Sequence, residues 1–101
     1  MKVAYYAVLA LALSVPALAQ NTTIAIKDFK FMLMDATVTP GSTVTWKNLD
    51  EEPHTVTSET GLFKSGGLDT DESFSFKFEK PGLYKYRCSI HPQMVGIITV
   101  K

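Results

Sequence analysis

The sequence predicts an all-β fold, a small Greek-key β-sandwich of about seven strands. Apolar residues alternate with polar or small residues in short runs through most of residues 20–101, which is the pattern of half-buried strands. Segments with proline and glycine separate these runs at short intervals, as in sandwiches and barrels. No segment carries the sustained 3.6-residue apolar stripe of an amphipathic helix.

The expected strands follow one another along the chain, each with inward-facing residues two positions apart. In the first half these residues are Ile24 and Ile26, Ala36 and Val38, and Val44 and Trp46. In the second half they are Phe74, Phe76 and Phe78, then Tyr84, Tyr86 and Cys88, and a last strand covers residues 96–100. We expect turns at residues 40–41, 48–53, 65–67 and 81–82, which contain turn-forming residues.

The first 19 residues have the features of a signal peptide. Lys2 supplies a positive charge, residues 3–13 form a mostly apolar run, and Ala17-Leu18-Ala19 is a small-x-small cleavage site. The run is shorter than the roughly 20 residues that span a bilayer as a helix. We therefore expect export to a bacterial periplasm, cleavage after Ala19, no stable membrane insertion afterwards, and one domain over residues 20–101.

Composition limits the function further. The 101 residues contain 10 Lys+Arg and 10 Asp+Glu, so the chain lacks the basic footprint that nucleic-acid binding requires.

A domain of this size needs an extra constraint such as a disulfide, a metal or a partner. The single cysteine, Cys88, excludes an internal disulfide, and a lone cysteine in an oxidising compartment needs protection from oxidation.

A group of metal-ligand residues supplies a candidate for that constraint. Cys88, His91 and Met94 follow one another at intervals of three residues, where a tight loop can turn their side chains toward one point. The only other histidine, His54, lies at the start of a strand. Each residue alone fits a purely structural role. Together, a thiolate, two imidazoles and a thioether form a soft set that suits one copper ion, as Cu(I) and as Cu(II), better than zinc.

With these residues, the sequence resembles the cupredoxins, the small type 1 blue copper proteins, over nearly all of residues 20–101. The matching segments are residues 40–48, 53–56 and 81–96, and the short Cys-x-x-His-x-x-Met loop is most similar to the amicyanin/plastocyanin group. The resemblance implies that His54, Cys88 and His91 are strong copper ligands and Met94 a weak axial one. It also implies a single-electron shuttle that exchanges electrons through the ring edge of His91.

Two positions depart from the pattern of these relatives. Many relatives have Asn directly after the first histidine, where its side chain ties two ligand loops together, but this chain has Thr55. The backbone amide of Thr55 can still donate to the Cys88 sulfur. Threonine in place of asparagine changes the side chain that is available to connect the two loops, and with it the hydrogen bonds that tune the reduction potential. Leu33 stands where relatives often have proline. The resemblance places this segment near the copper end, where Met32 and Met34 could pack, form a docking surface or contact Cu(I) transiently.

Two other functions compete with electron transfer. The same four ligands could serve a periplasmic protein that stores or delivers copper. A Cys/His nucleophile would leave Met94 and the loop spacing unexplained, and copper enzymes of this fold have further histidines next to the cysteine. We therefore expect no enzyme activity.

The expected partners are redox proteins such as a cytochrome c, a dehydrogenase or an oxidase, and the expected state is a monomer. Acidic residues gather at positions 50–52 and again at positions 69–72. Either group could steer a basic partner or form an ordinary solvated loop.

Overall fold

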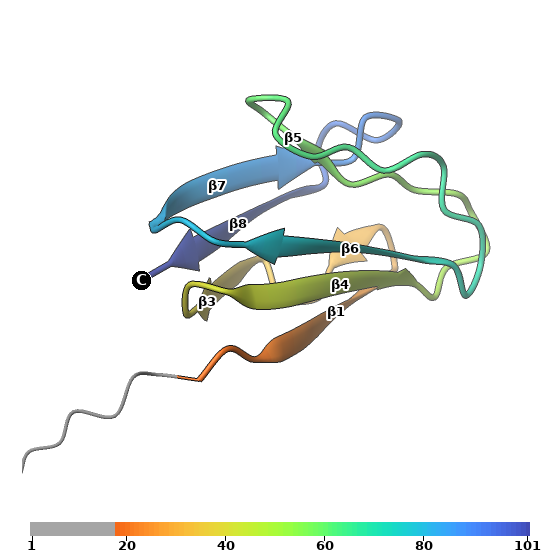
Figure 1. The fold of residues 1–101 in the computed structure, drawn as a ribbon. Helices are drawn as coiled ribbons and strands as arrows, with labels where there is room; N and C mark the ends of the chain where they lie inside the picture. The colour runs from red at the N-terminus through yellow and green to blue at the C-terminus, as the bar shows by residue number, and fades with distance from the viewer. Residues whose placement is uncertain (1–17) are drawn as a thin grey trace, which may run out of the picture.

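The computed structural model describes residues 18–101 as two β-sheets packed face to face (Figure 1). The strands are β1 (Asn21–Lys27), β2 (Lys30–Phe31), β3 (Asp35–Val38), β4 (Ser42–Asn48), β5 (Thr57–Ser58), β6 (Ser73–Phe78), β7 (Gly82–Arg87) and β8 (Val95–Val100). The signal peptide expected at residues 1–19 lies almost entirely outside the described residues. Within residues 18–101, no helix is long and apolar enough to cross a membrane.

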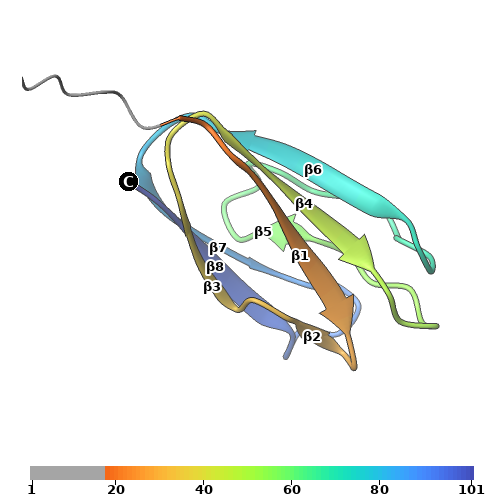
Figure 2. The same cartoon turned by 90° about the horizontal axis from the view of Figure 1, so that it is seen from below.

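The two sheets have the strand orders β2-β1-β4-β6 and β3-β8-β7-β5. Each sheet is mixed, because β1 runs parallel to β4 and β3 runs parallel to β8, while the other neighbours are antiparallel. Every connection from β2 to β7 crosses between the sheets, and Figure 2 shows the two layers that result. The predicted β-sandwich is confirmed, with eight described strands rather than about seven, since β2 and β5 have only two residues each.

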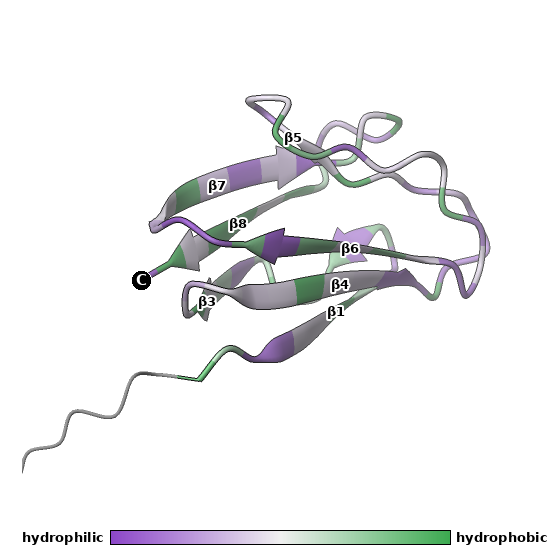
Figure 3. Cartoon of the chain, viewed as in Figure 1, coloured by the Kyte–Doolittle hydropathy of each residue, from purple (hydrophilic) through white to green (hydrophobic). Residues whose placement is uncertain are grey.

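The predicted alternation directs one face of each long strand into the core. Along β4 the buried residues are Ser42, Val44, Trp46 and Asn48, and the residues between them are half-buried or exposed. Trp46 lies at the centre of the core, with its ring centroid 5.2 Å from that of Tyr86. The same alternation of hydrophobic and hydrophilic residues is visible along β6 and β7 (Figure 3). Burial of this aromatic surface is the main source of stability in so small a sandwich.

Three connections meet at one end of the sandwich and form the surroundings of the candidate site (Figure 1). The loop after β4 leads to His54, the loop of residues 88–94 joins β7 to β8, and the turn at residues 28–29 joins β1 to β2. The amide of Leu49 donates to the carbonyl of Ile26 at 2.8 Å, which holds the ends of β4 and β1 together. Chain segments far apart in the sequence are thereby placed side by side.

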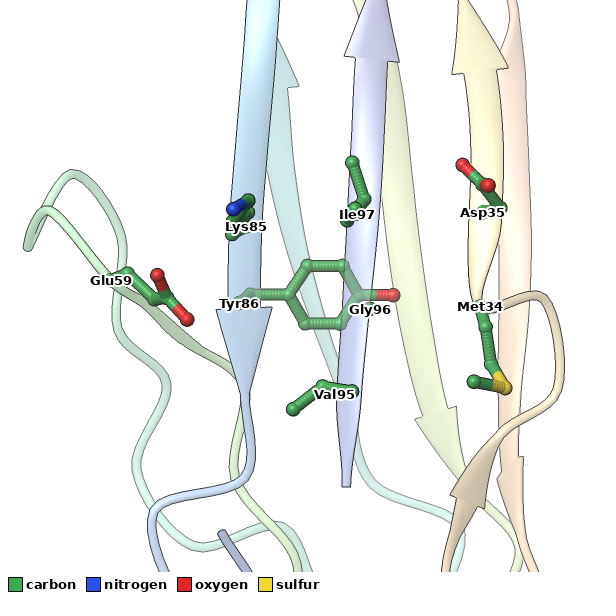
Figure 4. Close-up of a pocket in the computed structure, with 8 residues that line it drawn as sticks. All are labelled: Met34, Asp35, Glu59, Lys85, Tyr86, Val95, Gly96 and Ile97. Atoms are coloured by element: carbon green, nitrogen blue, oxygen red, sulfur yellow. The ribbon is translucent and has the colours of Figure 1, made fainter. Parts of the chain in front are cut away.

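Tyr86 of β7 pairs with Gly96 of β8, and its ring covers the glycine (Figure 4). A Cβ atom added at Gly96 would overlap the end of the Tyr86 ring. Burial raises the pKa of Tyr86 to about 12, an effect that the Trp46 side chain partly opposes. The phenol is therefore neutral at physiological pH, and Tyr86 serves to pack the core next to Cys88.

We predict that Gly96→Ala lowers the free energy of unfolding by about 1–3 kcal/mol, because the added methyl group must displace the Tyr86 ring in a closely packed core. Urea denaturation of the metal-free protein measures this change. Gly66→Ala is the matched control, since a Cβ at Gly66 meets no atom within 4 Å. Equal stabilities of the two variants would contradict the packing argument.

Candidate metal centre

The structure brings together three of the residues that the sequence singled out. The Nδ1 atoms of His54 and His91 lie 3.2 Å apart, and the Cys88 sulfur lies 3.9 Å and 3.7 Å from them, respectively. All three ligand atoms fall within 4.8 Å of one another. His54 and Cys88 are buried and His91 is half-buried. This arrangement is a small triangle of two imidazole nitrogens and one sulfur.

The triangle has the dimensions of a metal site. A point equidistant from the three atoms lies about 2.1 Å from each, within the range of about 2.0–2.3 Å for zinc bonds to nitrogen and sulfur. The chemistry of the set agrees with this geometry, because neutral imidazole nitrogen and cysteine sulfur bind soft and borderline metals. The residues present therefore fit a single metal ion.

Met94 lies at the end of the same loop as Cys88 and His91. The Cys88 amide donates to the Met94 carbonyl at 3.0 Å, and the Met94 amide donates to the His91 carbonyl at 2.9 Å. These bonds close the loop, and the Met94 side chain is buried. Met94 therefore lies on the closed loop that also carries Cys88 and His91, and its role as a fourth ligand stays a prediction.

His54 lies in a different loop, the one that joins β4 to β5. Its backbone forms an isolated bridge with Leu68, in which the two amides donate to the two carbonyls at 3.1 and 2.7 Å. Its ring nitrogen Nε2 lies 2.8 Å from the Asp50 carboxylate. Because a carboxylate accepts, Nε2 carries the proton, and Nδ1 keeps a lone pair for a metal.

Asp50 is a functional residue that the sequence alone did not reveal. The sequence placed it in an acidic loop group that could face a partner, but its side chain is buried, whereas Glu51 and Glu52 are exposed. The amides of Asp28 and Phe29 donate to the carboxylate at 2.7 and 2.9 Å. Burial acts to raise the pKa of Asp50, but the Phe29 and Asp28 amides and His54 together hold it below its usual value. Asp50 is therefore a charged acceptor that orients His54.

The turn that supplies these two amides has an unusual backbone. Asp28 and Phe29 have φ angles of 53° and 59°, in the left-handed region, as the two central residues of a tight hairpin require. Aspartate tolerates this conformation, but a bulky residue such as phenylalanine seldom adopts it. Because residues 27–30 contain neither glycine nor asparagine, the sequence carries no signal for the turn. The Phe29 ring stands edge-on to the rings of His54 and His91, with centroids 5.1 and 5.0 Å away.

Thr55 ties the loop of His54 to the loop of Cys88. Its backbone amide donates to the Cys88 sulfur at 3.3 Å, as the sequence suggested. Its hydroxyl oxygen accepts the Ser89 amide at 2.7 Å and lies 2.9 Å from the Ser89 hydroxyl. The Thr55 side chain thus connects the two ligand loops, although this chain lacks the asparagine that many relatives have at this position.

Comparison with known protein families also indicates a copper-binding protein. The family described as copper binding proteins of the plastocyanin/azurin family matches residues 18–101. Amicyanin-alpha of Methylorubrum extorquens is 36% identical over 93 residues, which cover 82% of this chain and 74% of that protein. Amicyanin of Paracoccus versutus is 30% identical over 88 residues, covering 82% of this chain and 67% of its own length.

Solved structures agree with the sequence comparison. A purple cupredoxin from Nitrosopumilus maritimus superposes with a TM-score of 0.73 at 35% identity, covering 79% of this chain and 99% of its own. An amicyanin variant in its Cu(I) form superposes with a TM-score of 0.76 at 28% identity, covering 79% of this chain and 81% of its own. The sandwich and its loops are thus arranged as in copper-binding proteins.

We predict that Asp50→Asn lowers the affinity for the metal about 10- to 100-fold, because the neutral amide no longer fixes the His54 ring with a charged acceptor. Competition with a chelator of known affinity measures the change. Glu51→Gln makes the same change of charge at an exposed neighbour and should have little effect. If the two variants lose equal affinity, Asp50 acts through its charge alone and does not position His54.

We predict that Thr55→Val lowers the free energy of unfolding by about 1–3 kcal/mol, because it leaves the Ser89 amide without its acceptor. Thr55→Ser keeps the hydroxyl and should remain close to the unsubstituted protein. Urea denaturation of all three proteins decides the point. A valine variant as stable as the serine variant would show that the hydroxyl does not tie the loops.

Proposed function

The chain belongs to the plastocyanin/azurin family of copper-binding proteins, and we propose that it binds one copper ion through His54, Cys88, His91 and Met94. The observation that carries this proposal is the triangle of the His54 and His91 Nδ1 atoms and the Cys88 sulfur. The buried Met94 on the same loop would add a soft thioether donor, which blue-copper sites also use.

The function is to carry single electrons, as in the amicyanins that the chain resembles, and the chain is not an enzyme. When bound, copper supplies a couple between Cu(I) and Cu(II) that takes up or releases one electron. The sequence contains only two histidines, and both belong to the proposed site. No histidine is left over to hold the additional coppers of multicopper enzymes.

The residues of the chain keep the site the same shape in both oxidation states. Asp50 fixes the ring of His54, and Thr55 donates its amide to the Cys88 sulfur and ties the two loops. Such bonds limit the rearrangement that would accompany the gain or loss of an electron. A site that does not have to reorganise exchanges electrons faster than one that does.

His91 is the proposed point of electron exchange. It is half-buried, whereas His54 and Cys88 are buried, so its ring offers a short path from the site toward the surface. Phe29, with 43% of its surface exposed, stands edge-on to the His91 ring and widens the apolar surface there. A redox partner that docks at this end can therefore approach the site closely.

The cellular setting is also a proposal. Redox partners such as a cytochrome c, a dehydrogenase or an oxidase would exchange electrons with a monomer in a bacterial periplasm. The alanine-rich site before Gln20 supports export with cleavage after Ala19. Of the acidic residues 50–52, only the exposed carboxylates of Glu51 and Glu52 are free to steer a basic partner, because that of Asp50 is occupied.

The test is a titration of residues 20–101 with Cu(II), followed by visible absorption. We expect an intense blue or purple band from the bond between sulfur and copper, which bleaches on addition of one electron and returns on oxidation. Cys88→Ser should lack the band, and the protein loaded with Zn(II) should be colourless because Zn(II) has a filled d shell. A copper complex without an intense band, or one that does not cycle, would overturn the proposal and favour copper carriage.

A further inference from the structure

A small hollow opens beside the proposed ligand Met94. It has a volume of about 50 Å³, and its lining includes Phe29, Met34, Gln93 and Met94. The Met94 side chain is buried, whereas 55% of the Met34 surface is exposed. The hollow therefore borders both an exposed methionine and the buried methionine of the ligand loop.

Met34 also borders the outside of the sandwich. A larger cavity, of about 380 Å³, lies on the sheet surface formed by β3, β8 and β7, and Met34 and Val95 line both this cavity and the hollow. Figure 4 shows Met34 at the start of β3, with its thioether extending away from Asp35. Met34 thus lies between an open surface cavity and the hollow that reaches Met94.

The position of Met34 is unusual for its residue type. Methionine usually fills irregular gaps in a core, where its apolar surface is removed from water. A methionine with 55% of its surface exposed gains little from burial, but its sulfur remains a soft donor that prefers Cu(I) to hard cations. The sequence left open whether Met32 and Met34 pack or contact Cu(I). The shared hollow distinguishes Met34, because Met32 lines neither of the two cavities.

Two of the proposed ligand residues cannot be approached directly, whereas His91 is half-buried. His54 and Cys88 have no exposed surface, and the Phe29 ring stands against both imidazoles. We propose that Met34 is an uptake ligand, which binds incoming Cu(I) at the mouth of the hollow and passes it to Met94. This inference rests on the proposed copper site and adds the route by which the metal reaches it.

The proposed transfer moves copper from its donor complex to the site without changing the oxidation state of the metal. Copper is Cu(I) in the complex that delivers it and Cu(I) in the site, so no electron moves. When Cys88 binds the metal, its S–H bond breaks, the sulfur keeps the electron pair as a thiolate, and the proton passes to solvent. The donor is a Cu(I) complex with a soluble chelator, which loses its metal.

The charged groups around the route do not supply a competing site. Asp35, Glu59 and Lys85 line the outer cavity, and Lys30 lines the hollow. The lysine beside the hollow disfavours a bare cation and favours an anionic copper complex. The selectivity of the route is therefore assigned to the soft sulfur donors.

The test measures the exchange of Cu(I) between bicinchoninate and residues 20–101 in both directions, by the absorbance of the coloured chelate. Met34→Leu keeps the side-chain volume and removes the sulfur. If Met34 holds copper along the route, loading and removal should both slow by about tenfold, equivalent to a barrier about 1.4 kcal/mol higher each way, with the dissociation constant unchanged. A merely structural effect would instead alter the dissociation constant.

Met32→Leu is the matched control, because Met32 has the same exposed fraction, 55%, and lies two residues away. The proposal is supported if Met34→Leu slows both directions and Met32→Leu slows neither. It is overturned if both variants exchange copper at the rate of the unsubstituted protein, if both slow equally, or if Met34→Leu changes only the affinity. Failure of the unsubstituted protein to take copper from the chelator would overturn the copper site and the uptake ligand together, which distinguishes that failure from the others.

Discussion

The carboxylate of Asp50 is the interaction on which the geometry of the site depends. It joins two segments, since it belongs to the loop after β4, where it faces the His54 ring, and it accepts the amides of the turn between β1 and β2. A buried carboxylate is costly unless its oxygens are satisfied, and here three donors satisfy them. The same bonds select the His54 tautomer whose Nδ1 faces Cys88 and His91. The Asp50 carboxylate thus stabilises the left-handed turn of Asp28 and Phe29, and the two amides of this turn in return hold the carboxylate.

A second set of hydrogen bonds performs the corresponding task for the cysteine loop. The amide and hydroxyl of Thr55 connect the His54 loop to Cys88 and Ser89, and the loop closes on itself through the backbone of Met94. With Asp50, these bonds hold the side chains of His54, Cys88 and His91, from two distant segments, close to one another. A small sandwich without a disulfide can in this way present a preformed site, and bound metal would add stability by mass action.

The surroundings of the site combine aromatic and sulfur-containing side chains. Phe29 and the half-buried His91 offer an apolar, aromatic approach that suits electron exchange with a docked partner. Met34 and Met94 share a hollow, also lined by Phe29, that suits the proposed passage of the metal itself.

The sequence by itself determined the all-β class, the order of the main strands and the loop of Cys88, His91 and Met94. These features depend on local patterns, a period of two along strands and a spacing of three within one loop, and such patterns can be recognised without knowing the fold. Tertiary structure alone decided the role of Asp50, the hydroxyl tie of Thr55 and the separate positions of Met32 and Met34. Each of these depends on which distant segments meet, as Asp50 meets Phe29 across the ends of β1 and β4. An aspartate followed by two glutamates has the same local pattern whether its carboxylate faces water or two backbone amides, so only the folded chain could distinguish the two.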